Sequence, residues 1–153
     1  MASILTLVRS EPVRQLARGE ILIEAGGQGG QMFVLETGRL TVSRDGVDVA
    51  IIAEPGALIG EMAVLLGTDH SATVTADVAS TVRVIDDALA FLERTPIVAL
   101  HVATLACERL DRTTALLVQL RKDSEGRSGE QSLLGRIFSS LTVPSAERPR
   151  AHE

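Results

Sequence analysis

One segment of the chain, residues 59–74, most constrains what the protein can fold into. A glycine turn there leads to a short apolar run, a second glycine turn and then polar residues that enter a strand. Gly60 can adopt a positive φ and lets the backbone approach a ligand closely. Residues 61–66 suit a single helical turn, whose first N–H groups lack partners and attract anions. Glu61 accepts hydrogen bonds only when ionised, so it suits a sugar hydroxyl. The segment predicts a cup for a sugar phosphate.

The same segment resembles the phosphate-binding cassette of cyclic nucleotide-binding domains. The match is carried by Gly60-Glu61-Met62-Ala63, Gly67-Thr68 and Ser71-Ala72-Thr73-Val74. The resemblance implies a cyclic nucleotide, cAMP or cGMP, as ligand. It also implies that Glu61 binds the ribose hydroxyl and that the phosphate is held by the N–H groups of Gly60, Glu61 and Met62, together with Ser71 and Ala72.

The chain departs from the family pattern at two adjacent positions. Asp69-His70 stands where the family has Pro-Arg, and the family arginine clamps the phosphate. A guanidinium offers a planar fork of donors, which an imidazole cannot match. His70 is therefore the candidate phosphate partner, and histidine changes its charge between pH 5 and 8. Asp69 adds a negative charge beside the anion site. Two functions stay open: a cyclic nucleotide sensor, and a degenerate module that keeps the fold without the ligand.

Short strands with turns between them predict an antiparallel β-roll or jelly-roll barrel over about residues 19–85. The expected strands cover residues 20–24, 32–35, 40–42, 47–53, 72–76 and 80–85, and Asp45-Gly46 predicts a tight hairpin. Residues 2–17 are expected to form one or two short helical turns at the edge of the domain. The order of Gly19-Glu20, the Gly26 loop, Phe33-Val34-Leu35 and Gly38 extends the family resemblance over about residues 16–122. The fold class is therefore α+β.

Helices are expected after the barrel, over about residues 87–122. Asp86-Asp87 favour a helix start, and Pro96 opens a long helix over about residues 97–122. The first half of that helix is apolar nearly all round, which suits burial against the barrel, and Cys107 is expected in the core. Its second half has a coiled-coil spacing, so a homodimer seam and a core-facing stripe remain alternatives. The seam residues are Ala103, Ala106, Leu110, Thr113, Leu117 and Leu120.

Arg109-Leu110-Asp111-Arg112-Thr113-Thr114 resembles the long helix of catabolite-activator-type regulators, in which a Thr-Ser pair faces the adenine. By that match Thr113 and Thr114 bind a purine. The alternative is that Thr113 is a polar seam residue and that Thr114 is solvated.

The remaining residues, 123–153, are expected to form a polar linker, a short amphipathic helix over 132–141 and a frayed tail. About 30 residues cannot supply a helix-turn-helix reader, so direct DNA binding is not expected. The chain therefore resembles the sensor domain of such regulators without the DNA-binding domain, acting on an unidentified effector protein.

Composition narrows the function further. A formal charge of −5 argues against nonspecific binding to nucleic acids or anionic membranes. One cysteine, no long apolar run and no signal peptide predict a cytoplasmic protein without a membrane span. No enzyme is expected, because Asp69, His70 and Ser71 are sequence neighbours without a nucleophile-elbow motif. Three scattered histidines and one cysteine predict no metal site.

Overall fold

The computed structural model describes residues 4–124 and 137. The chain divides into two compact units, Met1–Thr104 and Leu105–Glu153, with the boundary inside one long helix. The first unit holds the β structure and three short helices, and it contains the segment 59–74. The expected linker, the helix over 132–141 and the tail lie outside the described residues, apart from residues 123, 124 and 137.

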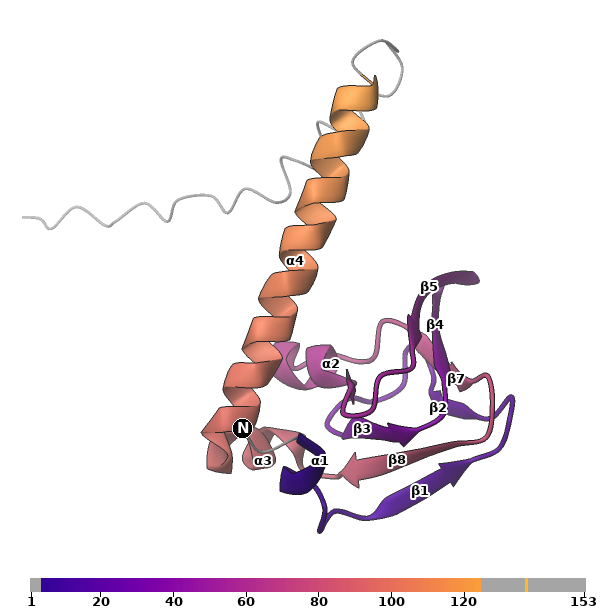
Figure 1. Cartoon of the computed structure of the whole chain (residues 1–153), viewed down its shortest axis with the longest axis vertical. Helices are drawn as coiled ribbons and strands as arrows, with labels where there is room; N and C mark the ends of the chain where they lie inside the picture. The colour runs from indigo at the N-terminus through magenta and orange to yellow at the C-terminus, as the bar shows by residue number, and fades with distance from the viewer. Residues whose placement is uncertain (1–3, 125–136, 138–153) are drawn as a thin grey trace, which may run out of the picture. The chain divides into compact units, whose positions relative to one another are not determined.

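Two four-stranded antiparallel sheets form the body of the first unit (Figure 1). One sheet has the strand order β1 (Val13–Leu16), β8 (Ser80–Ile85), β3 (Met32–Thr37) and β6 (Leu58–Ile59). The other has the order β2 (Ile21–Ile23), β7 (Thr73–Ala76), β4 (Leu40–Arg44) and β5 (Val47–Ile52). Strands distant in sequence are neighbours in both sheets, as in a jelly roll. The predicted α+β roll is therefore confirmed.

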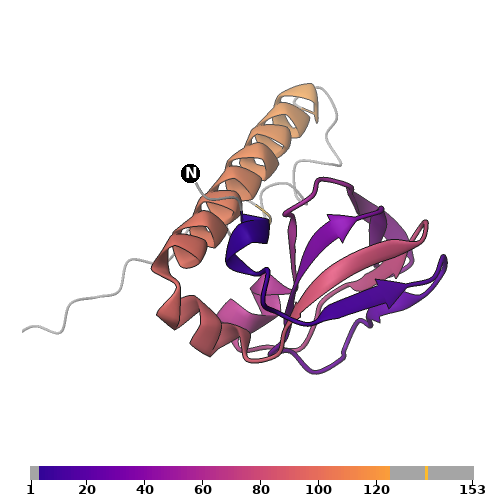
Figure 2. The same ribbon diagram turned by 60° about the horizontal axis from the view of Figure 1, so that its bottom comes forward.

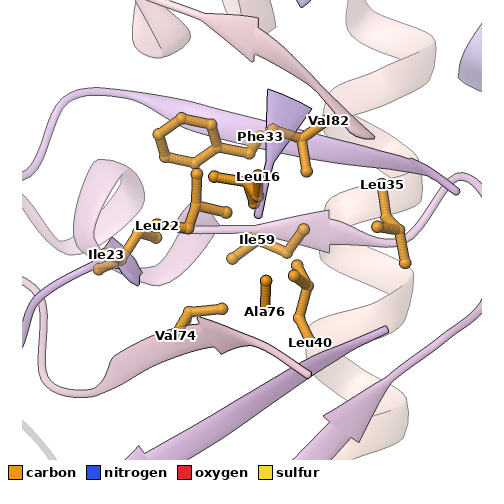
Figure 3. Packing of buried hydrophobic residues seen from close by; sticks show 10 residues of the cluster. All are labelled: Leu16, Leu22, Ile23, Phe33, Leu35, Leu40, Ile59, Val74, Ala76 and Val82. Carbon is orange, nitrogen blue, oxygen red and sulfur yellow. The ribbon is translucent and has the colours of Figure 1, made fainter. Parts of the chain in front are cut away.

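The inner faces of the two sheets enclose one apolar cluster (Figure 3). Its members come from both sheets, and Leu35, Leu40 and Val82 are fully buried. Burial of such side chains stabilises the fold by about 1.5–3 kcal/mol each relative to exposure. The cluster comprises Leu16, Leu22, Ile23, Phe33, Leu35, Leu40, Ile59, Val74, Ala76 and Val82.

The β4–β5 hairpin closes on a two-residue turn. Asp45 and Gly46 both have positive φ, 51° and 77°, as a turn that matches the strand twist requires. Arg44 pairs with Val47 across it. The hairpin expected from Asp-Gly is confirmed.

The described helices are separate from the segments in which apolar residues alternate as in a strand. They are α1 (Ile4–Leu7), α2 (Glu61–Leu66), α3 (Ala88–Arg94) and α4 (Pro96–Ser124). Asp87 caps α3, because its Oδ1 accepts a 3.2 Å hydrogen bond from the N–H of Ala90. Pro96 occupies the first position of α4, where its missing N–H costs nothing. The helical turn predicted at 61–66 and the long helix are both confirmed.

Three expectations were wrong. Residues 13–16 form strand β1, which runs beside β8 (Figure 2), although Val13 and Leu16 have a helix-like spacing. Cys107 is exposed and is not a core residue. The first turns of α4 bury only one stripe: Val98 is 1% exposed, whereas Leu100 is 68% exposed. A helix that covers a small roll needs only one apolar face.

None of the described helices alone is long and apolar enough to cross a membrane. α3 and α4 together reach that length and apolarity, but they meet at a bend of 110°.

Candidate functional site

Helix α2 begins without a side-chain cap. Gly60 is the N-cap residue, with φ 89° and ψ 0°, and no side-chain hydrogen bond caps the helix. The first backbone bond of the turn runs from the N–H of Val64 to the carbonyl of Gly60 at 3.4 Å. The N–H groups before Val64 therefore have no intrahelical carbonyl to bind, and they gather at the positive end of the helix dipole.

Glu61 is a buried carboxylate at the start of α2. It is the first residue of α2 and is 8% exposed, and it has an interaction partner within the protein. Burial of an ionised group is costly unless it is hydrogen-bonded, so its position beside helical N–H groups is favourable. Ala63 and Val64 anchor the same turn in the interior, whereas Met62 is 54% exposed. The turn thus fixes Glu61 and leaves Met62 at the surface.

His70 is held in place through its backbone. Its carbonyl accepts a 2.7 Å hydrogen bond from the N–H of Gly26, and its N–H donates a 2.9 Å bond to the carbonyl of Gly27. These two bonds, one to each of two successive glycines, fix the backbone of His70 against the loop at residues 26–31. The imidazole is half-buried, and its Cε1 lies 3.5 Å from the position that a Cβ on Gly60 would occupy. The structure therefore brings His70 to the cap of α2, and its role toward a phosphate stays a prediction.

The loop at residues 26–31 forms a further wall of this site. At Gly29 an added Cβ would lie 2.5 Å from the carbonyl oxygen of Thr68 and 3.1 Å from the Cβ of Ala63. At Gly60 an added Cβ would lie 3.0 Å from the carbonyl oxygen of Gln31. The loop is thus packed against both ends of α2. The sequence marked it as a glycine-rich turn and contained no signal that it contacts the helix.

Ser71 and Ala72 follow His70 toward strand β7. Ser71 is exposed and Ala72 is half-buried. The next residue, Thr73, accepts a 3.0 Å hydrogen bond from the N–H of Ala25 through its Oγ1. Backbone and side-chain hydrogen bonds therefore hold residues 25–27 against residues 70–73. Because His70 also lies at the cap of α2, the six predicted residues of the first unit lie near one another. They are Gly60, Glu61, Met62, His70, Ser71 and Ala72.

Thr113 and Thr114 belong to the second unit. The hydroxyl of Thr113 donates a 2.8 Å hydrogen bond to the carbonyl of Arg109, so its donor is used within the helix. Thr113 is exposed and Thr114 is half-buried. Their role toward a purine stays a prediction.

A separate cavity of about 470 Å³ opens near the start of β8 and is lined by none of the predicted site residues. At its edge Glu20 accepts a 3.0 Å hydrogen bond from the N–H of Ala17 and a 3.1 Å bond from Arg14. The bond from Ala17 has the larger effect and the bond from Arg14 the smaller one, and both hold the pKa of Glu20 below its ordinary value. Among residues 4–124 and 137, no three His, Cys, Asp or Glu side chains lie close enough to hold a metal ion.

The chain was compared with protein families and with known proteins. The family model described as "Cyclic nucleotide-binding domain" matches residues 13–93. A comparison with curated proteins found no significant match.

Three solved structures are similar to the chain at 26–28% identity. The catabolite activator protein of Thermus thermophilus is 26% identical with a TM-score of 0.68, over 79% of this chain and 60% of that one. The N-terminal domain of a transcriptional regulator from Streptomyces coelicolor A3(2) is 28% identical with a TM-score of 0.52, over 71% of this chain and 81% of that one. A protein from a cyclic-GMP-dependent signalling pathway that regulates bacterial phytopathogenesis is 26% identical with a TM-score of 0.58. The match covers 73% of this chain and 95% of that one. The match thus spans 60% of the length of the Thermus protein.

Proposed function

Since this chain belongs to the cyclic nucleotide-binding domain family, we propose that it is a regulatory sensor of a cyclic purine nucleotide, most directly cAMP. The observation that carries the proposal is that the uncapped start of α2, the buried Glu61 and the backbone-fixed His70 lie close together in the first unit.

Each predicted site residue has a role in this proposal. The N–H groups at Gly60, Glu61 and Met62 receive the cyclic phosphate, because the N–H groups at the start of a helix have no intrahelical carbonyl to bind and attract anions. His70 adds a donor, with a positive charge when its ring is protonated. Ser71 and Ala72 complete the phosphate pocket.

The ribose and the base are bound by different parts of the chain. The carboxylate of Glu61 accepts a hydrogen bond from the ribose 2′-hydroxyl. Thr113 and Thr114 in α4 bind the purine, which links the ligand to the long helix. Binding then favours one position of the C-terminal helices and shifts an equilibrium that already exists without ligand.

α4 is also the proposed homodimer seam. Leu110 and Leu120 are 59% and 55% exposed, and both belong to the stripe with spacings of three and four. Sedimentation of Leu110→Lys tests the seam, with Val118→Lys as control because Val118 lies off the stripe. Loss of the dimer only in Leu110→Lys supports the seam, whereas a dimer that survives both substitutions argues against it.

The assignment of the ribose to Glu61 is tested by a thermodynamic cycle in which one step changes the ligand and the other changes the protein. Binding of cAMP and 2′-deoxy-cAMP is measured by titration calorimetry with the wild-type chain and with Glu61→Gln. Loss of the 2′-hydroxyl weakens binding to the wild type about tenfold, as expected for a hydrogen bond to a charged group. It has little effect on Glu61→Gln, because the charged acceptor is already gone. Equal losses in both proteins would remove Glu61 from the ribose site. cGMP in the same titration tests the choice of base.

A second candidate function, an interaction module without nucleotide, is favoured by Asp69 and His70 in place of Pro-Arg. The same titration separates the two functions, since a module of this kind gives no heat with any cyclic nucleotide.

A further inference from the structure

The loop at residues 26–31 is bonded to the start of α3 as well as packed against α2. The side chain of Gln31 donates a 2.7 Å hydrogen bond through its Nε2 to Oδ1 of Asp86, one residue before the N-cap of α3. The carbonyl of Gly30 accepts a 3.2 Å bond from the N–H of Ala88, the first residue of α3. Two successive loop residues therefore hold the start of this helix.

The bond between Gln31 and Asp86 extends the pairing of strands β3 and β8. Met32 lies opposite Ile85 at the end of that pairing, and both side chains are buried. Gln31 and Asp86 lie one position beyond this pair and are exposed. Because the buried residues already fix the backbone on both sides, the bond orders only two side chains. Its acceptor is a carboxylate, which makes it stronger than a bond between neutral groups.

The same loop contacts the proposed nucleotide site. The carbonyl oxygen of Gln31 lies 3.0 Å from the position that a Cβ on Gly60 would occupy. At the other end of the loop, Gly26 and Gly27 bond the backbone of His70. Gln31 thus contacts the cap of α2 through its main chain and the approach to α3 through its side chain.

We propose that the loop at residues 26–31 transmits occupancy of the nucleotide site to α3, with Gln31 as the positioning residue. This regulation rests on the proposed function. A nucleotide at the cap of α2 and His70 holds the loop in one position, and the bonds of Gly30 and Gln31 impose that position on the start of α3. Coupling between two sites is reciprocal, so the same bonds favour binding of the nucleotide.

Transmission to α3 also affects the beginning of α4. Only Thr95 lies between the end of α3 and Pro96, the first residue of α4. A second route to α3 is open, because α2 and α3 also contact each other. The experiment must therefore separate the loop from this direct contact.

Exchange of donor and acceptor gives a matched pair of variants. Gln31→Glu sets two carboxylates against each other in place of the bond. The double variant Gln31→Glu/Asp86→Asn restores a hydrogen bond in the opposite direction, since the amide of asparagine donates to the carboxylate of glutamate. Both variants carry the same change at residue 31, so a difference between them reports the bond itself.

Amide hydrogen exchange without nucleotide tests the connection. The N–H groups of Ala88 and His70 report its two ends, because each donates to a carbonyl of the loop. Their rates are divided by that of the Asp77 N–H, which is bonded in a separate turn. In Gln31→Glu we expect both ratios to rise about tenfold, as for a lost bond to a charged group, and to return in the double variant. A rise at Ala88 alone, or at neither amide, overturns the proposal.

Exchange with saturating cAMP tests the transmission, with binding measured beside it by calorimetry. In the wild type and the double variant we expect cAMP to slow exchange at His70 and at Ala88. In Gln31→Glu it should slow exchange at His70 only. Equal slowing at Ala88 in all three proteins assigns transmission to the direct contact of α2 with α3 and overturns the loop route.

Failure of the proposed function gives a different result from failure of this inference. If calorimetry detects cAMP binding but exchange at Ala88 does not respond in the wild type, transmission by the loop is wrong and the sensor function stands. If no protein binds cAMP, the sensor function fails and transmission fails with it. The rates without nucleotide then still decide whether the loop joins His70 to α3.

Discussion

The imidazole of His70 lies against the cap of helix α2, with its Cε1 3.5 Å from the position of a Cβ on Gly60. The two residues are ten positions apart, and the loop at residues 26–31 contacts both of them. It bonds His70 at Gly26 and Gly27, and it faces Gly60 with the carbonyl of Gln31. The proposed ligand site is therefore built from three segments of the chain, which meet at glycine positions.

The cap of α2 provides the first prediction. Gly60→Ala combines an unfavourable φ of 89° with a Cβ 3.0 Å from the Gln31 carbonyl oxygen. Gly67→Ala at the other end of the helix has φ 62° but open space around its Cβ. We expect Gly67→Ala to lower the free energy of unfolding by about 1–2 kcal/mol through backbone strain alone. Gly60→Ala should cost more and should also weaken cAMP binding, as measured by urea unfolding and calorimetry. Equal effects of the two substitutions would show that the cap is not crowded.

The loop wall provides the second prediction. Gly29→Ala brings a Cβ to 2.5 Å from the Thr68 carbonyl oxygen, so the loop or α2 must move. We expect a loss of about 1–3 kcal/mol in the free energy of unfolding, as for overpacking, together with weaker nucleotide binding. Gln28→Ala, an exposed neighbour, is the control and should change neither quantity. If Gly29→Ala binds cAMP as the wild type does, the loop has no part in the site.

The sequence predicted the parts of the fold that local pattern decides. Six of the eight strands in the described part of the chain, the Asp45-Gly46 hairpin and the turn at 61–66 follow from strand-length apolar runs and turn residues. β1 was missed because Val13 and Leu16 are three residues apart, and its strand form depends on pairing with β8, about 70 residues away. The apolar neighbours of Cys107 in the sequence predict a core position, but the residue is exposed. Burial of a helical residue depends on which segments pack against that side of the helix, and the local sequence does not encode this.

The candidate site shows the same division. Gly60 and Glu61 stand out in the sequence because a glycine followed by a carboxylate at a helix start has a local meaning. The bonds of His70 to Gly26 and Gly27 join residues more than 40 positions apart. No local pattern encodes such a contact, so the loop wall could be found only from the folded chain.

Arg83 provides a prediction about the N-terminal segment. Its Nε donates a 2.7 Å bond to Glu36, and its Nη1 donates 3.0 Å bonds to the carbonyls of Arg9 and Glu11. A lysine cannot reproduce this planar fork, so Arg83→Lys should lower the free energy of unfolding by about 2 kcal/mol. Arg39→Lys is the control, because Arg39 is 53% exposed and bonds Asp77 at the surface. It should cost less than about 1 kcal/mol. Comparable losses by urea unfolding would contradict the anchoring role of Arg83.

Glu20 provides a prediction about pH. Its pKa is held low by the N–H of Ala17 and by Arg14, so the ionised carboxylate binds them in the folded state only. A lowered pKa stabilises the fold above the ordinary glutamate value of about 4.3, and this contribution disappears as the pH falls through the folded value. Glu20→Gln should therefore be less stable than the wild type at pH 7, and the difference should shrink below pH 4. A difference that is constant from pH 7 to pH 3 in thermal unfolding would exclude this linkage.

The central claim is that α2, Glu61 and His70 together form a cyclic nucleotide site. Calorimetric titration of cAMP into the full chain and into His70→Arg, each at pH 6 and pH 8, tests it most directly. We predict one nucleotide per chain, and binding by His70→Arg about tenfold tighter than binding by the wild type at both pH values. No heat from either protein at millimolar cAMP would contradict the claim, since the arginine restores the family clamp and leaves only the cup itself to fail.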